Sequence, residues 1–70
     1  MNNVIDCICR NLPHSEVRVT SPTLIKGQEF IVIGVDCFYS NIPVVLTKKP
    51  YTKNRFNIPY NLIENIIIIP

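Results

Sequence analysis

The C-terminal stretch, residues 55–70, constrains the fold of this chain more than any other part of the sequence. Phe56 and Ile58 alternate with polar residues and a proline, as in a strand that buries one face. Residues 60–64 then leave room for one helical turn, and four consecutive isoleucines at 66–69 favour a return to extended structure because they are β-branched. The pattern predicts a strand, a one-turn helix and a closing strand.

Prolines and glycines divide the preceding part of the chain into three further strands. We expect these strands at residues 16–20, 30–39 and 42–47, with the middle one bent at Gly34, where the missing side chain permits a bulge. Gly27, in the loop between the first two, can adopt a positive φ angle without strain. Strand alternation then predicts one core, made of Val17, Val19, Ile33, Val35, Val44, Leu46, Phe56, Ile58, Leu62 and Ile67.

The resulting order of five short strands resembles an SH3-like barrel. The spacing over residues 16–69, notably Val17-Arg18-Val19, Gly27 and the segment 56–64, is similar to that of KOW-type domains and of the variable chain of ferredoxin–thioredoxin reductase. The resemblance implies an all-β fold, a five-stranded SH3-like barrel with a one-turn helix before the last strand. No catalytic or cofactor motif of either family maps onto this chain, so neither function is carried over. An Sm-like or OB-like small barrel is the alternative.

Residues 1–13 form a segment of their own, which we expect to cover a barrel at residues 14–70. Its apolar positions follow helical spacing, with Asn2 or Asn3 as the N-cap and Pro13 as the stop, although part of the segment also alternates as a strand does. Helix, strand and disorder therefore all stay open. The helical alternative places four apolar residues on one face: Val4, Ile5, Ile8 and Leu12.

Composition limits the class of protein. Seventy residues suit one small domain, and 47% hydrophobic residues with 17% charged residues predict a packed core, not a disordered chain. The odd number of cysteines, three, and the absence of a basic, apolar secretory leader predict a reducing, cytoplasmic location. No stretch approaches the roughly 18 apolar residues that a membrane span needs, so we expect no membrane partner.

A basic loop is the strongest candidate for a charged binding surface. Four of the seven basic residues fall within residues 48–55, and no acidic residue occurs between Asp36 and Glu64. An aromatic residue lies among them, and aromatic rings beside cations can stack bases while the cations hold phosphates. The less specific interpretation is a solvated hairpin whose lysines protect a sheet edge. The candidate binding residues are Lys48, Lys49, Tyr51, Lys53 and Arg55.

Metal binding and catalysis find little support in the sequence. Cys7, Cys9, His14 and Cys37 offer zinc ligands, but the single residue between the first two is shorter than the usual zinc knuckle. The acidic residues are scattered singly, and there is one histidine. We therefore predict no metal, no cofactor and no catalytic residues, and hence no enzyme.

The last strand points to a protein partner. Residues 66–69 are apolar on both faces, so one face can enter the core while the other needs cover from residues 1–13 or from another chain. We therefore expect a non-catalytic binding or adaptor module for a protein partner, or a homodimer formed through this strand. Binding of nucleic acid through the basic loop is the alternative. The sequence specifies neither the identity of the partner nor the oligomeric state.

Overall fold

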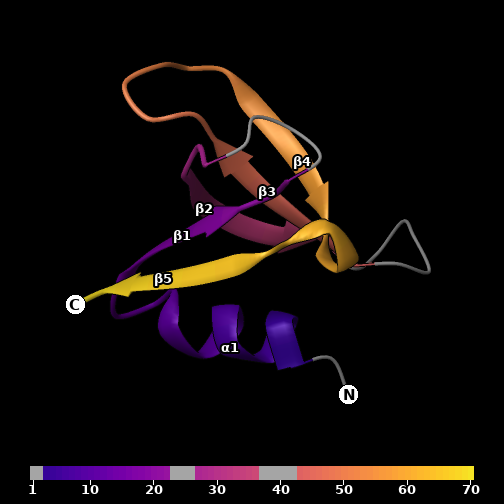
Figure 1. Ribbon diagram of the computed structural model, residues 1–70. Helices are drawn as coiled ribbons and strands as arrows, with labels where there is room; N and C mark the ends of the chain where they lie inside the picture. Colours follow the sequence, from indigo (N-terminus) through magenta and orange to yellow (C-terminus); the bar gives the residue numbers. More distant parts are fainter. Residues whose placement is uncertain (1–2, 23–26, 37–42) are drawn as a thin grey trace.

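The computed structural model describes residues 3–22, 27–36 and 43–70 of the chain. Its elements are α1 (Asn3–Asn11), β1 (Glu16–Thr20), β2 (Phe30–Asp36), β3 (Val44–Lys48), β4 (Arg55–Pro59), the 3-10 turn η1 (Tyr60–Leu62) and β5 (Asn65–Ile69). All ladders are antiparallel, and the strand order is β4-β3-β2-β1-β5 (Figure 1). The five predicted strands and the one-turn helix are confirmed. The predicted strand residues 37–39 and 42 lie outside the described residues, and Pro43, also predicted in the third strand, lies just before β3.

The sheet has two edge strands. Each of β1 to β4 pairs with its neighbour in sequence, and β5 returns to pair with β1 along its whole length. Within the described part of the chain, β4 and β5 are the edges, and no ladder joins them. The predicted barrel is therefore confirmed only in a coarser form, as a five-stranded antiparallel sheet with an N-terminal helix and a 3-10 turn.

A register shift interrupts the ladder between β2 and β3. Val32 lies opposite Thr47, whereas Gly34 lies opposite Leu46, so Ile33 is an extra residue on β2. This irregularity confirms the bulge predicted at Gly34. The extra residue is 43% exposed, so the prediction of Ile33 in the core is wrong.

Among the described residues, seven apolar side chains form the buried core: Ile8, Val17, Val19, Phe30, Val32, Val45 and Ile58. The predictions of Val17, Val19 and Ile58 are confirmed, and Val35 and Phe56 pack against this core in half-buried positions. The rings of Phe30 and Phe56 meet edge to face, with 5.3 Å between their centroids. Phe30 is completely buried and lies at the start of β2.

The predicted facing of β3 is wrong by one residue. Val45 and Thr47 are buried, whereas Val44 and Leu46 are half-exposed. The inward threonine is tolerated because its hydroxyl donates a 2.6 Å hydrogen bond to the carbonyl of Phe56 on β4. A one-residue slip moves every side chain to the other face. The sequence did not reveal this slip, because threonine is polar and is not expected in a core.

The predicted facing of β5 is wrong in the same way. Ile66 and Ile68 lie opposite the two buried valines of β1 and pack against the core, whereas Ile67 lies opposite Arg18 on the outer face. A run of identical side chains carries no alternation from which the inner face could be inferred. Leu62, also predicted in the core, is 38% exposed on η1.

The N-terminal segment is a helix, and it covers the inner face of β5. Helix α1 packs beside β1 and β5 (Figure 1). Ile8 is completely buried, while the opposite face of the helix carries the exposed Cys9 and Arg10. Arg10 donates a hydrogen bond to Asp6 one turn earlier, and this bond raises the pKa of Arg10. The predicted N-cap Asn2 lies outside the described residues.

Three more apolar side chains of the N-terminal segment pack against the core: Val4, Ile5 and Leu12. Their spacing is the one that predicted an amphipathic helix. The sequence left open whether this segment or another chain covers the last strand. On the inner face of β5, the cover comes from the N-terminal segment of the same chain. Among the described residues, no helix has the length and apolar character that a membrane span requires.

Candidate functional site: the β3–β4 hairpin and an adjoining hollow

The hairpin between β3 and β4 holds an aromatic residue in an unusual backbone conformation. Residues 49–52 form a turn in which the amide of Thr52 donates to the carbonyl of Lys49 at 3.3 Å. Pro50 fixes φ at the second position, and Tyr51, at the third, has a φ of +63°. A proline followed by a positive φ defines a type II turn, which normally has glycine or asparagine where this chain has tyrosine.

Further hydrogen bonds hold the turn in this conformation. The hydroxyl of Thr52 donates to the carbonyl of Lys49 at 3.1 Å and accepts from the amide of Asn54 at 3.2 Å. The amide of Lys49 donates to the carbonyl of Asn54 at 2.9 Å and closes the hairpin. Strained backbone of this kind costs on the order of 1 kcal/mol and persists where its surroundings determine it. The turn therefore presents the Tyr51 side chain to solvent, where it is 101% exposed.

The same hairpin carries cations that form no ion pair with another described residue. Lys48 and Arg55 are directly opposite each other in the β3–β4 ladder, an arrangement of like charges that disfavours the sheet. Within the described residues, neither of them forms an ion pair, and the same holds for Lys49 and Lys53. The hairpin thus accumulates positive charge that the described chain does not neutralise.

The cations continue across the outer face of the sheet. The strand register places Ile67, Arg18, Ile31, Lys48 and Arg55 in one row from β5 to β4. Three of these five residues are basic. Their side chains point away from the core because the neighbouring residues Val17, Val19 and Thr47 point into it.

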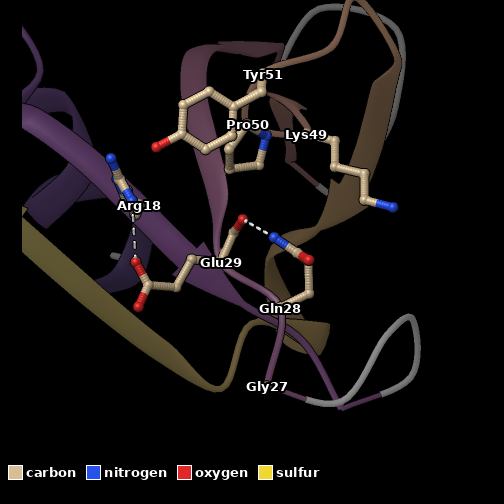
Figure 2. Close-up of a pocket in the computed structure, with 7 residues that line it drawn as sticks. All are labelled: Arg18, Gly27, Gln28, Glu29, Lys49, Pro50 and Tyr51. Atoms are coloured by element: carbon tan, nitrogen blue, oxygen red, sulfur yellow. Dashed lines mark hydrogen bonds and ion pairs between the residues drawn. The ribbon is translucent and has the colours of Figure 1, made fainter.

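A hollow of about 420 Å³ lies where the hairpin meets the beginning of β2. It is lined by Arg18, by residues 27–29 and by residues 49–51. Figure 2 shows the Tyr51 ring on the hairpin side and Arg18 with Glu29 on the sheet side. The Lys49 ammonium group points away from these two residues. Gly27 has a φ of +79°, so the predicted positive φ at this glycine is confirmed.

Arg18 is the electrostatic centre of the hollow. Its Nε donates to Glu16 at 2.9 Å, and its Nη1 donates to Glu29 at 3.4 Å. The hydrogen bond to Glu16, followed by the charge of Glu16 and the longer bond to Glu29, raises the pKa of Arg18. Its two partners hold the guanidinium in place, and the Arg18 side chain is 29% exposed to solvent.

The two polar residues beside Arg18 leave oxygen atoms available to a ligand. The Gln28 Nε2 group donates to the backbone carbonyl of Glu29 at 2.7 Å. The Gln28 side-chain oxygen accepts no hydrogen bond from another described residue, and among these residues the Glu29 carboxylate accepts only the long bond from Arg18. The floor of the hollow therefore presents acceptors next to a guanidinium.

The structure brings together four of the five predicted binding residues in two arrangements. Lys49 and Tyr51 line the hollow, and Lys48 and Arg55 form the basic pair of the outer face. Lys53 is exposed on the hairpin and belongs neither to the lining of the hollow nor to the basic pair.

The sequence did not single out three residues of the hollow: Arg18, Gln28 and Glu29. They lie twenty or more residues before Lys49 in the chain. Only the pairing of β2 with β1 and β3 brings them to it.

The cysteines and the histidine do not converge in the described structure. Cys7 and Cys9 are free thiols on α1, and His14 is exposed in the turn after the helix. Among the residues that the structure describes, no group of three histidine, cysteine or acidic side chains could hold a metal ion. Cys37 lies outside them.

Comparison with protein families, with curated proteins and with solved structures finds no match to this chain.

Proposed function

We propose that this protein is a small non-catalytic binding module whose ligand is single-stranded nucleic acid, bound by the β3–β4 hairpin. The observation that carries this proposal is Tyr51, an exposed aromatic ring on a strained turn of a hairpin whose four cations form no ion pair with another described residue. A ring of this kind can stack on a base, while nearby lysines and arginines contact the phosphates on either side. Two local costs, the positive φ and the opposed cations, are understandable if both groups serve a ligand.

This order of candidates reverses the one drawn from the sequence. A protein partner was expected because the apolar last strand needs cover, and α1 supplies that cover on the inner face. Nucleic acid was the alternative because basic and aromatic residues cluster in the sequence at 48–55. Four of those five residues now belong to the hollow or to the basic pair on the outer face.

The salt dependence of binding tests the proposal. Each phosphate that is neutralised releases counterions, so contacts by four cations should give a slope of about −3 in log affinity against log salt for a single strand. We expect mixed single-stranded oligonucleotides to bind at low salt in a filter assay. Changing Lys48, Lys49 and Lys53 together to glutamine should reduce the slope to about −1.

A matched pair of single variants provides the control. Lys49→Gln and Arg10→Gln each remove one positive charge, but Arg10 lies on the exposed face of α1. Only Lys49→Gln should weaken binding if the hairpin is the contact surface. Equal losses would indicate a nonspecific effect of net charge. If no oligonucleotide binds at low salt, the nucleic-acid proposal is wrong.

A protein partner is the second candidate, and the outer side of β5 favours it. Ile69 is 38% exposed, and Ile67 is half-buried on the outer face. The strand itself carries no charged residue and lies at the edge of the sheet. An edge of this kind can accept a strand from another protein or from a second copy of this chain.

We also propose that the sheet closes into the SH3-like barrel implied by the family resemblance. The strand order, the bulge in β2 and the 3-10 turn between β4 and β5 support closure, because these features allow the two edges to approach each other. Nuclear Overhauser contacts between backbone protons of β4 and β5 test this. Their absence from an assigned spectrum would leave the sheet open, with β5 as an edge that can accept a further strand. Their presence would exclude strand addition at that edge and leave only the outward side chains of β5 as a contact surface.

A further inference from the structure

We infer that the hollow beside Tyr51 binds a guanine base, and this inference rests on the proposed nucleic-acid function. The hollow combines an aromatic platform with hydrogen-bonding side chains on the facing wall (Figure 2). Its volume of about 420 Å³ is large enough for a single base. A single-stranded base can turn into such a site and stack on the tyrosine ring while its edge meets the polar wall.

The identity of the base follows from the groups on that wall. The Glu29 carboxylate can only accept hydrogen bonds, and its one partner among the described residues is Arg18 Nη1 at 3.4 Å. Arg18 stands next to it and can only donate. The wall therefore presents two hydrogen-bond acceptors followed by a donor, from one side to the other.

Guanine has the complementary edge. Its 2-amino group and N1–H are adjacent donors, and its O6 acceptor follows them. The Watson–Crick edges of adenine, cytosine and thymine each present a single donor position. Paired donors would meet the two oxygens of Glu29, and O6 would accept from Arg18. The side-chain oxygen of Gln28 is a further acceptor. Its amide nitrogen already donates a hydrogen bond to the backbone carbonyl of Glu29 at 2.7 Å.

Glu16 holds the donor of this wall in position. It binds Arg18 Nε at 2.9 Å and has the same side-chain exposure as Glu29, 42%. It does not line the hollow.

The test compares short oligothymidylates that carry one central guanine, inosine, adenine or cytosine. We expect the guanine oligonucleotide to bind about tenfold more tightly than the adenine or cytosine ones, with inosine between them because it lacks the 2-amino donor. Glu29→Gln should abolish this preference, and Glu64→Gln, which removes the same charge from an exposed residue that does not line the hollow, should keep it. Circular dichroism melting of both variants checks that the fold survives.

The outcomes separate the two proposals. If no oligonucleotide binds, both the nucleic-acid function and the base site fall. If all four bind equally, or if both variants lose the preference equally, the nucleic-acid function stands and the guanine site is wrong. Competition with guanosine monophosphate identifies the source of the base. A free nucleotide that binds as tightly as the oligonucleotide would show that the site serves nucleotides, not strands.

Discussion

Tyr51 has two properties that do not contribute to the stability of the fold. Its φ of +63° is strained for any residue with a side chain, and its ring makes no buried contact because it is 101% exposed. We predict that Tyr51→Gly keeps or raises the free energy of unfolding, by up to about 1 kcal/mol, because glycine accepts this φ. Tyr51→Val should lower the free energy of unfolding by about 1–2 kcal/mol, because a β-branched residue is more strained there.

Urea unfolding of the three proteins measures this order. Both variants lack the ring, so both should lose oligonucleotide binding although their stabilities differ in opposite directions. That separation distinguishes a ring kept for binding from one kept for folding. A large loss of stability in Tyr51→Gly would contradict it and would assign the ring a structural role.

Phe30 is the residue on which the core depends most. It is completely buried and meets the ring of Phe56 edge to face, whereas Phe56 itself is only half-buried. We predict that Phe30→Ala lowers the free energy of unfolding by about 3–5 kcal/mol. This approaches the roughly 4–10 kcal/mol expected for a whole domain of this size. Phe56→Ala should cost clearly less in the same urea titration, and equal losses would place the two rings at the same depth.

The sequence predicts these residues unevenly, for physical reasons. In β1 and β4, apolar and polar residues alternate, so Val17, Val19 and Ile58 could be placed in the core correctly. In β3, the alternation misleads because the buried position 47 is a threonine whose hydroxyl is satisfied by a backbone carbonyl. In β5, identical isoleucines give no information about the face.

At the scale of elements, α1 closes the core over β1 and β5. Ile8 is its completely buried residue, and Cys9, next in sequence, is exposed. We predict that Ile8→Ala lowers the free energy of unfolding by about 2–4 kcal/mol, because it leaves a cavity between the helix and the sheet. Cys9→Ala should leave the free energy of unfolding unchanged within about 0.5 kcal/mol. Thermal melting of the two variants compares them directly, and equal melting temperatures would mean that α1 does not stabilise the core.

The helix also illustrates which parts of the fold a sequence can specify. Helical spacing and strand-like alternation compete over residues 1–13, and a short helix is marginal on its own. Packing against the sheet decides between them, and this contact is not visible in the local sequence. The hollow is likewise not visible in the local sequence, because Arg18 and Glu29 reach the hairpin only through strand pairing.

For the whole molecule, the two edges of the sheet differ in their protection against pairing. The edge strand β4 carries Arg55 and Pro59, a charge and an imino acid that oppose the addition of a strand. The edge strand β5 carries neither, and its outward Ile69 lies opposite Glu16 of β1. Association of copies should therefore occur through β5 and not through β4.

The last prediction tests this difference with one lysine at each edge. Ile69→Lys places a cation opposite Glu16, so the cross-strand pair should preserve the fold while the new charge disfavours edge-to-edge pairing. Sedimentation velocity over a range of concentrations should show that this variant associates less than the unchanged protein. Asn57→Lys adds the same charge to the already protected β4 and should leave association unchanged. If both lysines reduce association equally, net charge is responsible. If neither does, the apolar edge of β5 is not a contact surface, and the case for a protein partner through this strand is lost.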